Sequence, residues 1–182
     1  MPLAKYNGTF DRYQLTHLLK RSMFGAHLND IKKLNGKSLS EVLDILLLDS
    51  PLPAPPINNY NDATYTDPVV PANQTWVNAV YGDGTVNSKR LASFRGWWTG
   101  LLLNQQTSIQ EKMVLFWHNH FAVESAEVAD ARYMYKYVAL LQKNALGNFK
   151  KFVKEITLDP AMLKYLNGYL NTKTAPDENY CR

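Results

Sequence analysis

The sequence has almost no cysteine, since Cys181 is the only one among 182 residues. An intrachain disulfide is therefore excluded, and so is a zinc site built mainly from cysteine ligands. Long apolar runs are also absent. The longest, residues 42–48, is interrupted by Asp44 and falls far short of the roughly 20 residues that a membrane-spanning helix needs. We therefore predict no membrane span.

A signal peptide is not visible either, because Lys5 is followed by polar residues and no apolar segment comes next. The sequence also lacks a large excess of either sign of charge, since its net charge is only +4. The lysines at 150, 151 and 154 lie beside Glu155 and Asp159, which is typical of a solvated helix face. Nucleic-acid binding is not predicted, because specific binders usually carry a denser basic stripe.

Apolar residues recur at helical spacing along most of the chain. Several helix starts carry a capping side chain: Asp11, Ser38 with Glu41 three residues later, Asn148, and Asp159 followed by Pro160. We therefore predict an all-α fold, an orthogonal or bundle-like array of about seven or eight helices. Residues 1–182 are expected to form a single helical domain.

Proline breaks this pattern in one region. Six of the nine prolines fall within residues 50–71, and a regular helix cannot hold them. We predict a long loop over residues 50–87, rich in Pro, Asn and Tyr, that lies across the helical body. The next helix is expected to begin at Asn87 or Ser88. Further on, Thr107 and Ser108 suggest two overlapping capping boxes, and residues 127–146 read as one helix.

The most chemically equipped stretch is residues 110–123, QEKMVLFWHNHFAV, which holds two of the four histidines. Three interpretations compete for His118 and His120. They could bind a divalent metal together, one could act as a general base, or both could be structural with Asn119, bonding the backbone where the helix ends. Residues two apart on a helix point about 200° apart, so a shared metal requires the helix to end by His118.

The letters H-N-H also occur in the HNH nucleases, but that match is rejected. The signature residues of those nucleases are spread through a ββα-metal fold, which neighbouring histidine letters do not provide. Trp117, Phe116 and Phe121 flank the histidines and are typical of a core. A nucleic-acid groove would instead interleave aromatic and basic residues.

Several segments resemble, in order, a bacterial family called domain of unknown function 1800. The most specific words are WHNHF at residues 117–121 and DPAMLKYL at residues 159–166. LLKRSMFG at residues 18–25, ALGNFKKFV at residues 145–153 and PDENYCR at residues 176–182 also match. The resemblance implies a largely helical, longer protein, many of whose members look exported, with no settled activity. This chain is then expected to be an N-terminal part whose partner is the missing C-terminal part.

In that final segment Glu178, Asn179 and Arg182 match the family pattern, whereas Asp177 and Cys181 depart from it. Glu178 and Arg182 are four residues apart, so a helix would place them on one face, either as an ion pair or as two groups facing one site. The enzyme hypothesis is a hydrolase-like or metal-assisted activity that uses His118, His120 and Glu178. The alternative is a non-catalytic helical scaffold or export-associated binding module in which the histidines are structural.

Overall fold

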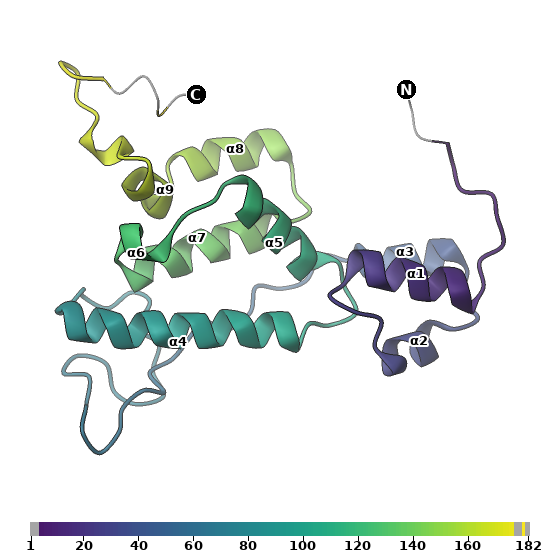
Figure 1. The fold of residues 1–182 in the computed structure, drawn as a ribbon, viewed down its shortest axis with the longest axis horizontal. Coiled ribbons are helices and arrows are strands. Elements are labelled where there is room, and N and C mark those ends of the chain that lie inside the picture. Colours follow the sequence, from purple (N-terminus) through teal and green to yellow (C-terminus); the bar gives the residue numbers. More distant parts are fainter. Residues whose placement is uncertain (1–3, 177–179, 181–182) are drawn as a thin grey trace.

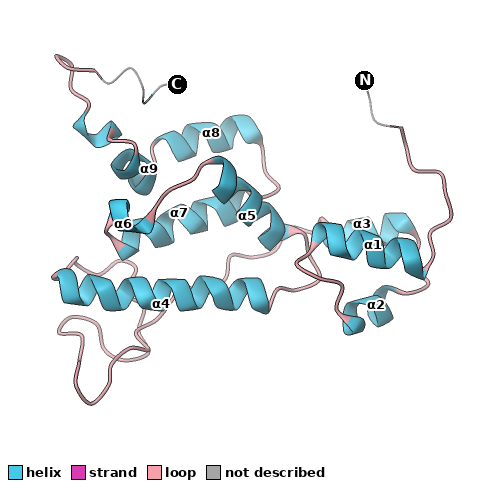
Figure 2. Ribbon diagram, in the orientation of Figure 1, coloured by secondary structure: helices cyan, strands magenta, loops and turns pink. Residues whose placement is uncertain are grey.

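The structure is a computed structural model that describes residues 4–176 and residue 180. Helices supply all the regular secondary structure of these residues, which confirms the all-α prediction (Figure 2). In chain order they are α1 (Arg12–Ser22), α2 (Leu28–Leu34), α3 (Leu39–Leu46), α4 (Gly84–Leu103), α5 (Gln110–His120), α6 (Ser125–Val128), α7 (Ala131–Asn144), α8 (Phe149–Thr157), α9 (Pro160–Tyr165) and the short 3-10 helix η1 (Gly168–Leu170).

The buried apolar side chains form two clusters. The smaller one joins α1, α2 and α3 and centres on Leu15, Leu19 and Leu34. The larger one has α7 at its middle, packed against α4, α5, α8 and α9. Figure 1 shows the three N-terminal helices grouped beyond one end of α4, with the remaining helices beside it. The segment between α4 and α5 links the groups, because Ile109 donates its backbone N–H to the Leu46 carbonyl.

Four predicted helix caps are confirmed. The side chains of Asp11, Ser38, Asn148 and Asp159 each accept a backbone N–H from the first turn of α1, α3, α8 and α9. Ser38 and Glu41 form the expected reciprocal capping box. These predictions succeeded because a cap depends only on residues within one helical turn.

Two predicted boundaries were wrong. Helix α4 begins at Gly84, before the expected Asn87, because the Asp83 carboxylate caps it by accepting the Val86 N–H. The predicted helix over residues 127–146 is broken into α6 and α7 at Ala129, whose φ of 52° lies in the left-handed region. Asp130 then caps α7.

The overlapping capping boxes proposed for α5 were also wrong. The residue before the helix is Ile109, which has no side-chain cap. The Thr107 hydroxyl instead donates to Asp30 at 2.5 Å, and the Ser108 hydroxyl accepts the Gln110 N–H. The Thr107 side chain therefore contacts α2, although the local sequence pattern had assigned it to the cap of α5.

The segment between α3 and α4 is an extended connection whose described residues contain one isolated antiparallel bridge, between Ile57 and Thr75. Trp76 from this segment is fully buried and donates its indole N–H to Ser93 on α4. The proline-rich loop is thus part of the core. Within residues 4–176 no helix is long and apolar enough to cross a membrane.

Candidate functional site

Helix α5 carries Trp117, His118, Asn119 and His120 in its last turn. The helix continues to His120, so the two histidines lie about 200° apart around its axis. Their ring contacts differ accordingly: His118 meets Trp98 and Tyr137, while His120 meets Trp117 and Phe121. This backbone is not the extended one that a metal shared by both imidazoles requires.

His118 takes part in a short hydrogen-bond chain. Its Nδ1 lies 2.9 Å from the Tyr137 hydroxyl, and that hydroxyl donates to the Phe121 carbonyl at 2.7 Å. A phenol has one proton and a carbonyl can only accept, so Nδ1 of His118 must be the donor to Tyr137. The network therefore assigns the Nδ1–H tautomer and leaves Nε2 of His118 with its lone pair.

The surroundings of His118 favour the neutral ring. Burial lowers its pKa below the usual value, because the charged imidazolium is poorly solvated there. The Trp98 indole meets the imidazole edge to face, with 5.0 Å between the ring centroids. Within the described part of the chain, the buried Trp98 Nε1 has no hydrogen-bond acceptor. His118 is thus a neutral, aromatic-packed histidine.

The other three residues of the motif behave differently. The indole of Trp117 stacks on Phe149 at 5.5 Å between centroids and donates its N–H to the Ala145 carbonyl at 3.1 Å. Asn119 and His120 are exposed. Trp117 therefore joins α5 to the start of α8, whereas Asn119 and His120 face solvent at the end of the helix.

A buried acid, Asp159, lies near this chain of hydrogen bonds and acts electrostatically on Tyr137. Asp159, only 4% exposed, caps α9 by accepting the N–H groups of Ala161 and Met162. Burial raises its pKa to about 6, and these hydrogen bonds oppose that rise. Burial also raises the pKa of Tyr137, and the Asp159 charge adds to that effect. Tyr137 consequently stays protonated and acts as a fixed donor to Phe121.

Glu178, Asn179 and Arg182 lie outside the described residues. Among residues 4–176 and 180, no three or more His, Cys, Asp or Glu side chains are grouped as metal ligands. The structure thus brings His118 together with Tyr137 and Phe121. It places His120 elsewhere on the surface of α5.

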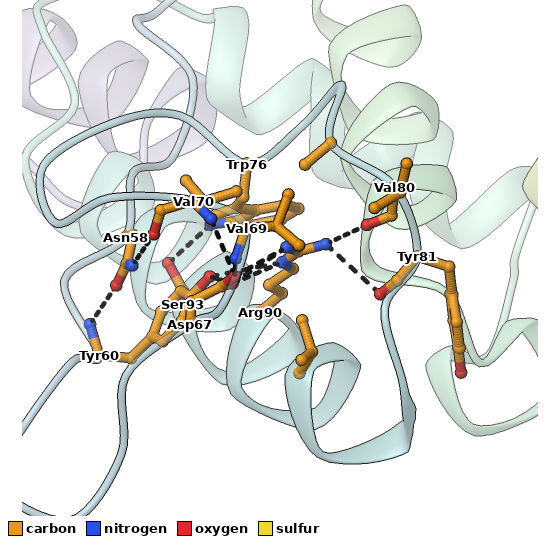
Figure 3. Close-up of polar contacts among 12 residues, drawn as sticks. Asn58, Tyr60, Asp67, Val69, Val70, Trp76, Val80, Tyr81, Arg90 and Ser93 are labelled. Carbon is orange, nitrogen blue, oxygen red and sulfur yellow. Dashed lines mark hydrogen bonds and ion pairs between the residues drawn. The ribbon is translucent and has the colours of Figure 1, made fainter.

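The most elaborate polar cluster is one that sequence reasoning missed. Figure 3 shows Arg90 of α4 beneath the proline-rich loop, with Asp67 from that loop facing it. The guanidinium Nη2 lies 3.0 Å from Asp67 Oδ2, and Nη1 donates to the Val80 carbonyl at 2.6 Å. The Tyr60 hydroxyl donates to Asp67 at 2.7 Å. The middle of the loop and the segment just before α4 are therefore both fastened to one arginine.

The electrostatics of this cluster are those of a paired ion. Burial by itself raises the pKa of Asp67. Hydrogen bonds to the carboxylate lower it by more, and they come from the backbone N–H groups of Val69 and Val70, the Tyr60 hydroxyl and the Arg90 guanidinium. The net pKa of Asp67 is lowered, so the carboxylate is ionised. Burial, followed by the bond to Asp67, raises the pKa of Tyr60 to about 12. The sequence signal was present: Arg90 lies four residues from both Val86 and Phe94, within a buried helix stripe.

The arrangement defines a class: an all-α protein whose long proline-rich loop is held to a central helix by a buried ion pair. Its sequence matches the profile of the family described as Protein of unknown function (DUF1800) over residues 17–182. The chain belongs to that family, as its WHNHF and DPAMLKYL segments predicted. No curated protein and no solved structure gives a significant match. The family description assigns no activity, so a function has to be argued from the residues.

Proposed function

We propose that this chain is a non-catalytic helical binding module in which His118 is structural. The observation that carries the proposal is the chain from His118 Nδ1 through the Tyr137 hydroxyl to the Phe121 carbonyl. Phe121 is the C-cap residue, directly after the last residue of α5. Its carbonyl is one of the helix-terminal acceptors that needs a donor, and Tyr137 of α7 supplies it. His118 in turn orients that hydroxyl.

Two further features support a structural role. His118 is packed between the rings of Trp98 and Tyr137, which come from α4 and α7. One side chain thus touches two neighbouring helices at the point where α5 stops. His120 is exposed and makes only ring contacts with Trp117 and Phe121 among the described residues.

The partner that we propose is the C-terminal part implied by the family resemblance. Large apolar side chains are exposed along the last described helices: Leu158, Leu166, Tyr169 and Leu170. Large exposed apolar side chains favour burial against another surface. In a longer protein that contains that part, amide hydrogen exchange in η1 should slow. Unchanged exchange there would contradict this choice of partner.

A second candidate function rests on the tautomer. Because Nδ1 of His118 carries the proton, Nε2 has a lone pair that can accept a proton or bind a metal. The hydrolase-like or metal-assisted hypothesis then uses His118 as its base or ligand, with His120 and Glu178 as additional groups. This alternative predicts that activity or metal affinity is lost when His118 is replaced.

The test compares three variants: His118→Gln, His120→Gln and the double variant. A module with a structural His118 should lose about 1–3 kcal/mol of unfolding free energy on His118→Gln, because Tyr137 loses its ordered partner. His120→Gln should change stability by less than about 0.5 kcal/mol, since its side chain is exposed. Urea unfolding measures both, and metal titration of the same samples measures affinity.

The outcomes separate the two functions. If His118→Gln keeps wild-type stability while metal affinity or a hydrolytic activity is lost, the structural proposal is overturned. If the double variant is as destabilised as His118→Gln alone and binds metal as wild type does, the structural proposal is supported. His17, which lies on α1 away from the site, offers a matched control as His17→Gln.

A further inference from the structure

A second site lies at the opposite end of α5 from His118. It is a cavity of about 320 Å³ between the proline-rich loop, the last turn of α4 and the first turn of α5. Its apolar walls come from Pro51, Leu52, Pro53 and Leu101. The polar side chains that line it include Gln105, Gln110 and Glu111. The volume falls in the range of small-ligand sites.

Three residues of this lining each have one side-chain oxygen that lacks a donor among the described residues: Oε1 of Gln105, Oε1 of Gln110 and Oε2 of Glu111. All three are buried. Gln110 as a whole is only 5% exposed. A buried acceptor without a donor costs about 1–3 kcal/mol, so native proteins rarely leave several together.

The orientation of two of these side chains is fixed by their other atoms. The Gln110 amide nitrogen donates to the Gln142 carbonyl at 3.2 Å, so exchanging its oxygen and nitrogen would set two acceptors against each other. The Gln142 amide nitrogen approaches the other Glu111 oxygen, Oε1, at 3.4 Å. The oxygens of Gln110 and Glu111 therefore lack a donor in the orientations that their other atoms fix, and both are shielded from the solvent that fills the cavity.

The chemistry of the missing group follows from this wall. The orphans of Gln110 and Glu111 are acceptors in fixed orientations, the Gln105 amide is free to present its oxygen beside them, and only Glu111 among the three can carry a charge. A primary ammonium has one positive charge, three N–H donors and no acceptor. Ca²⁺ takes six to eight oxygen ligands and Mg²⁺ a full octahedron, and three oxygens with one charge fall well short of either. The apolar walls match an aliphatic chain attached to the ammonium.

We propose that this cavity binds a primary alkylammonium group, with the nitrogen among Gln105, Gln110 and Glu111 and the alkyl chain along the Pro51–Leu52–Pro53 wall. Because the three oxygens are shielded from solvent, binding requires side chains of the lining to turn aside, and we assign this movement to Gln105. Gln105 is only half-buried and lies in the loop between α4 and α5, so this movement disturbs no helix. The inference goes beyond the proposed function and does not depend on the role of His118.

The ligand has two possible sources with the same chemistry, a free small amine or a lysine side chain of a peptide. Isothermal titration at constant ionic strength separates them by using n-butylammonium in one arm and Nα-acetyl-lysine methylamide in the other. Butyltrimethylammonium has the same charge but no N–H donor, and 1-butanol has the chain without the charge. We expect both primary amines to bind saturably. The trimethyl compound and the alcohol should bind at least about tenfold more weakly, since they lack the three donors or the charge.

The variants locate the binding. Glu111→Gln keeps the shape and removes the charge, so n-butylammonium affinity should fall at least tenfold while the fold is retained. Gln105→Leu is a second variant from the loop, and it should also weaken binding. Glu127→Gln removes an exposed carboxylate on α6 and should change nothing. His118→Gln should likewise leave amine binding unchanged, which separates this result from the test of the proposed function.

Three results would overturn the inference. The first is equal binding of n-butylammonium and butyltrimethylammonium, which would mean that charge alone attracts the cation. The second is unchanged affinity in both Glu111→Gln and Gln105→Leu, which would place the amine elsewhere. The third is an absence of saturable binding by either amine, which would mean that the cavity holds water only.

Discussion

Asp67 and Arg90 form an ion pair with 3.0 Å between Oδ2 and Nη2, and neither side chain has more than 1% of its surface exposed. The pair joins the proline-rich loop to α4. Two charges withdrawn from water in this way are tolerated only because each is fully hydrogen-bonded. Arg90 is satisfied by Asp67, Tyr60 and the carbonyl groups of the chain just before α4, Val80 and Tyr81.

The first prediction concerns this pair. Asp67→Asn leaves the Arg90 charge buried without a counterion, so we expect a loss of about 3–5 kcal/mol in unfolding free energy. Asp62→Asn is the matched control, because Asp62 pairs with Lys89 at 3.9 Å on the exposed side of the same loop. That change should leave the unfolding free energy nearly unchanged, because solvent and salt screen an exposed pair. Urea unfolding of the two variants checks the difference, and equal small losses would contradict the buried-pair account.

The second prediction concerns the end of α5. Tyr137→Phe removes the hydroxyl that joins Phe121 to His118 and leaves a carbonyl and an imidazole N–H without their partner. We expect a loss of about 1–3 kcal/mol. Tyr135 lies on the same helix, is half-buried and packs against Trp97 with the two rings tilted, and its hydroxyl makes no hydrogen bond to the described residues. Tyr135→Phe should therefore be nearly neutral in thermal unfolding, and a similar loss in both variants would argue against the hydrogen-bond chain.

The third prediction concerns pH. Burial raises the pKa of Asp159 from 3.8 to about 6 in the folded protein. Between these values the folded state holds a proton that the unfolded state has released, so the contribution of this carboxyl falls as pH rises. A shift of that size corresponds to about 3 kcal/mol, fully present below pH 4 and lost above pH 6.

Asp159→Asn isolates this effect, because asparagine retains an oxygen that can cap α9 but does not ionise. We expect the variant to match wild type near pH 4 and to be more stable than wild type at pH 7.5. The measurement is urea unfolding of both proteins at the two pH values. A wild-type advantage at pH 7.5 would mean that the ionised carboxylate stabilises the helix start.

The parts of the fold that could be predicted from sequence are those set by nearby residues. Ser38 and Glu41 are three apart, and their capping box appeared as expected. Asp67 and Arg90 are 23 residues apart, and their pairing depends on how the loop crosses α4. Arg90 is a charged residue within the buried stripe of α4. Its burial is explained only by a partner from another part of the chain, Asp67.

The same distinction applies to the candidate site. The WHNHF motif located the end of α5, but the role of His118 depends on Tyr137, which comes from a different helix. Helical geometry correctly separated His118 from His120 once the helix was known to reach His120. The break at Ala129 was missed because alanine favours continuing a helix, and the one local sign was Asp130, which caps α7.

The last prediction uses that break. Ala129 ends α6 with a φ of 52°, whereas the other non-glycine residues with positive φ, among those described, are Asn73 and Asn167. Asparagine tolerates this conformation, but the Cβ of alanine crowds the following carbonyl at a cost of roughly 1–2 kcal/mol. Ala129 is exposed, so removing its methyl group forfeits little packing. Ala129→Gly should therefore raise the unfolding free energy by about 0.5–1 kcal/mol, after the extra backbone entropy of glycine is subtracted.

Ala126→Gly provides the matched control, because Ala126 is also exposed but lies inside α6 with helical geometry. Glycine there should destabilise the protein by up to about 1 kcal/mol, the opposite sign to the change at Ala129. The conformation at Ala129 matters beyond α6, since its carbonyl accepts the Asn87 amide at 3.0 Å and Asn87 also receives the Ala131 N–H. If both glycine variants lower the unfolding free energy, then the left-handed turn at Ala129 is not strained.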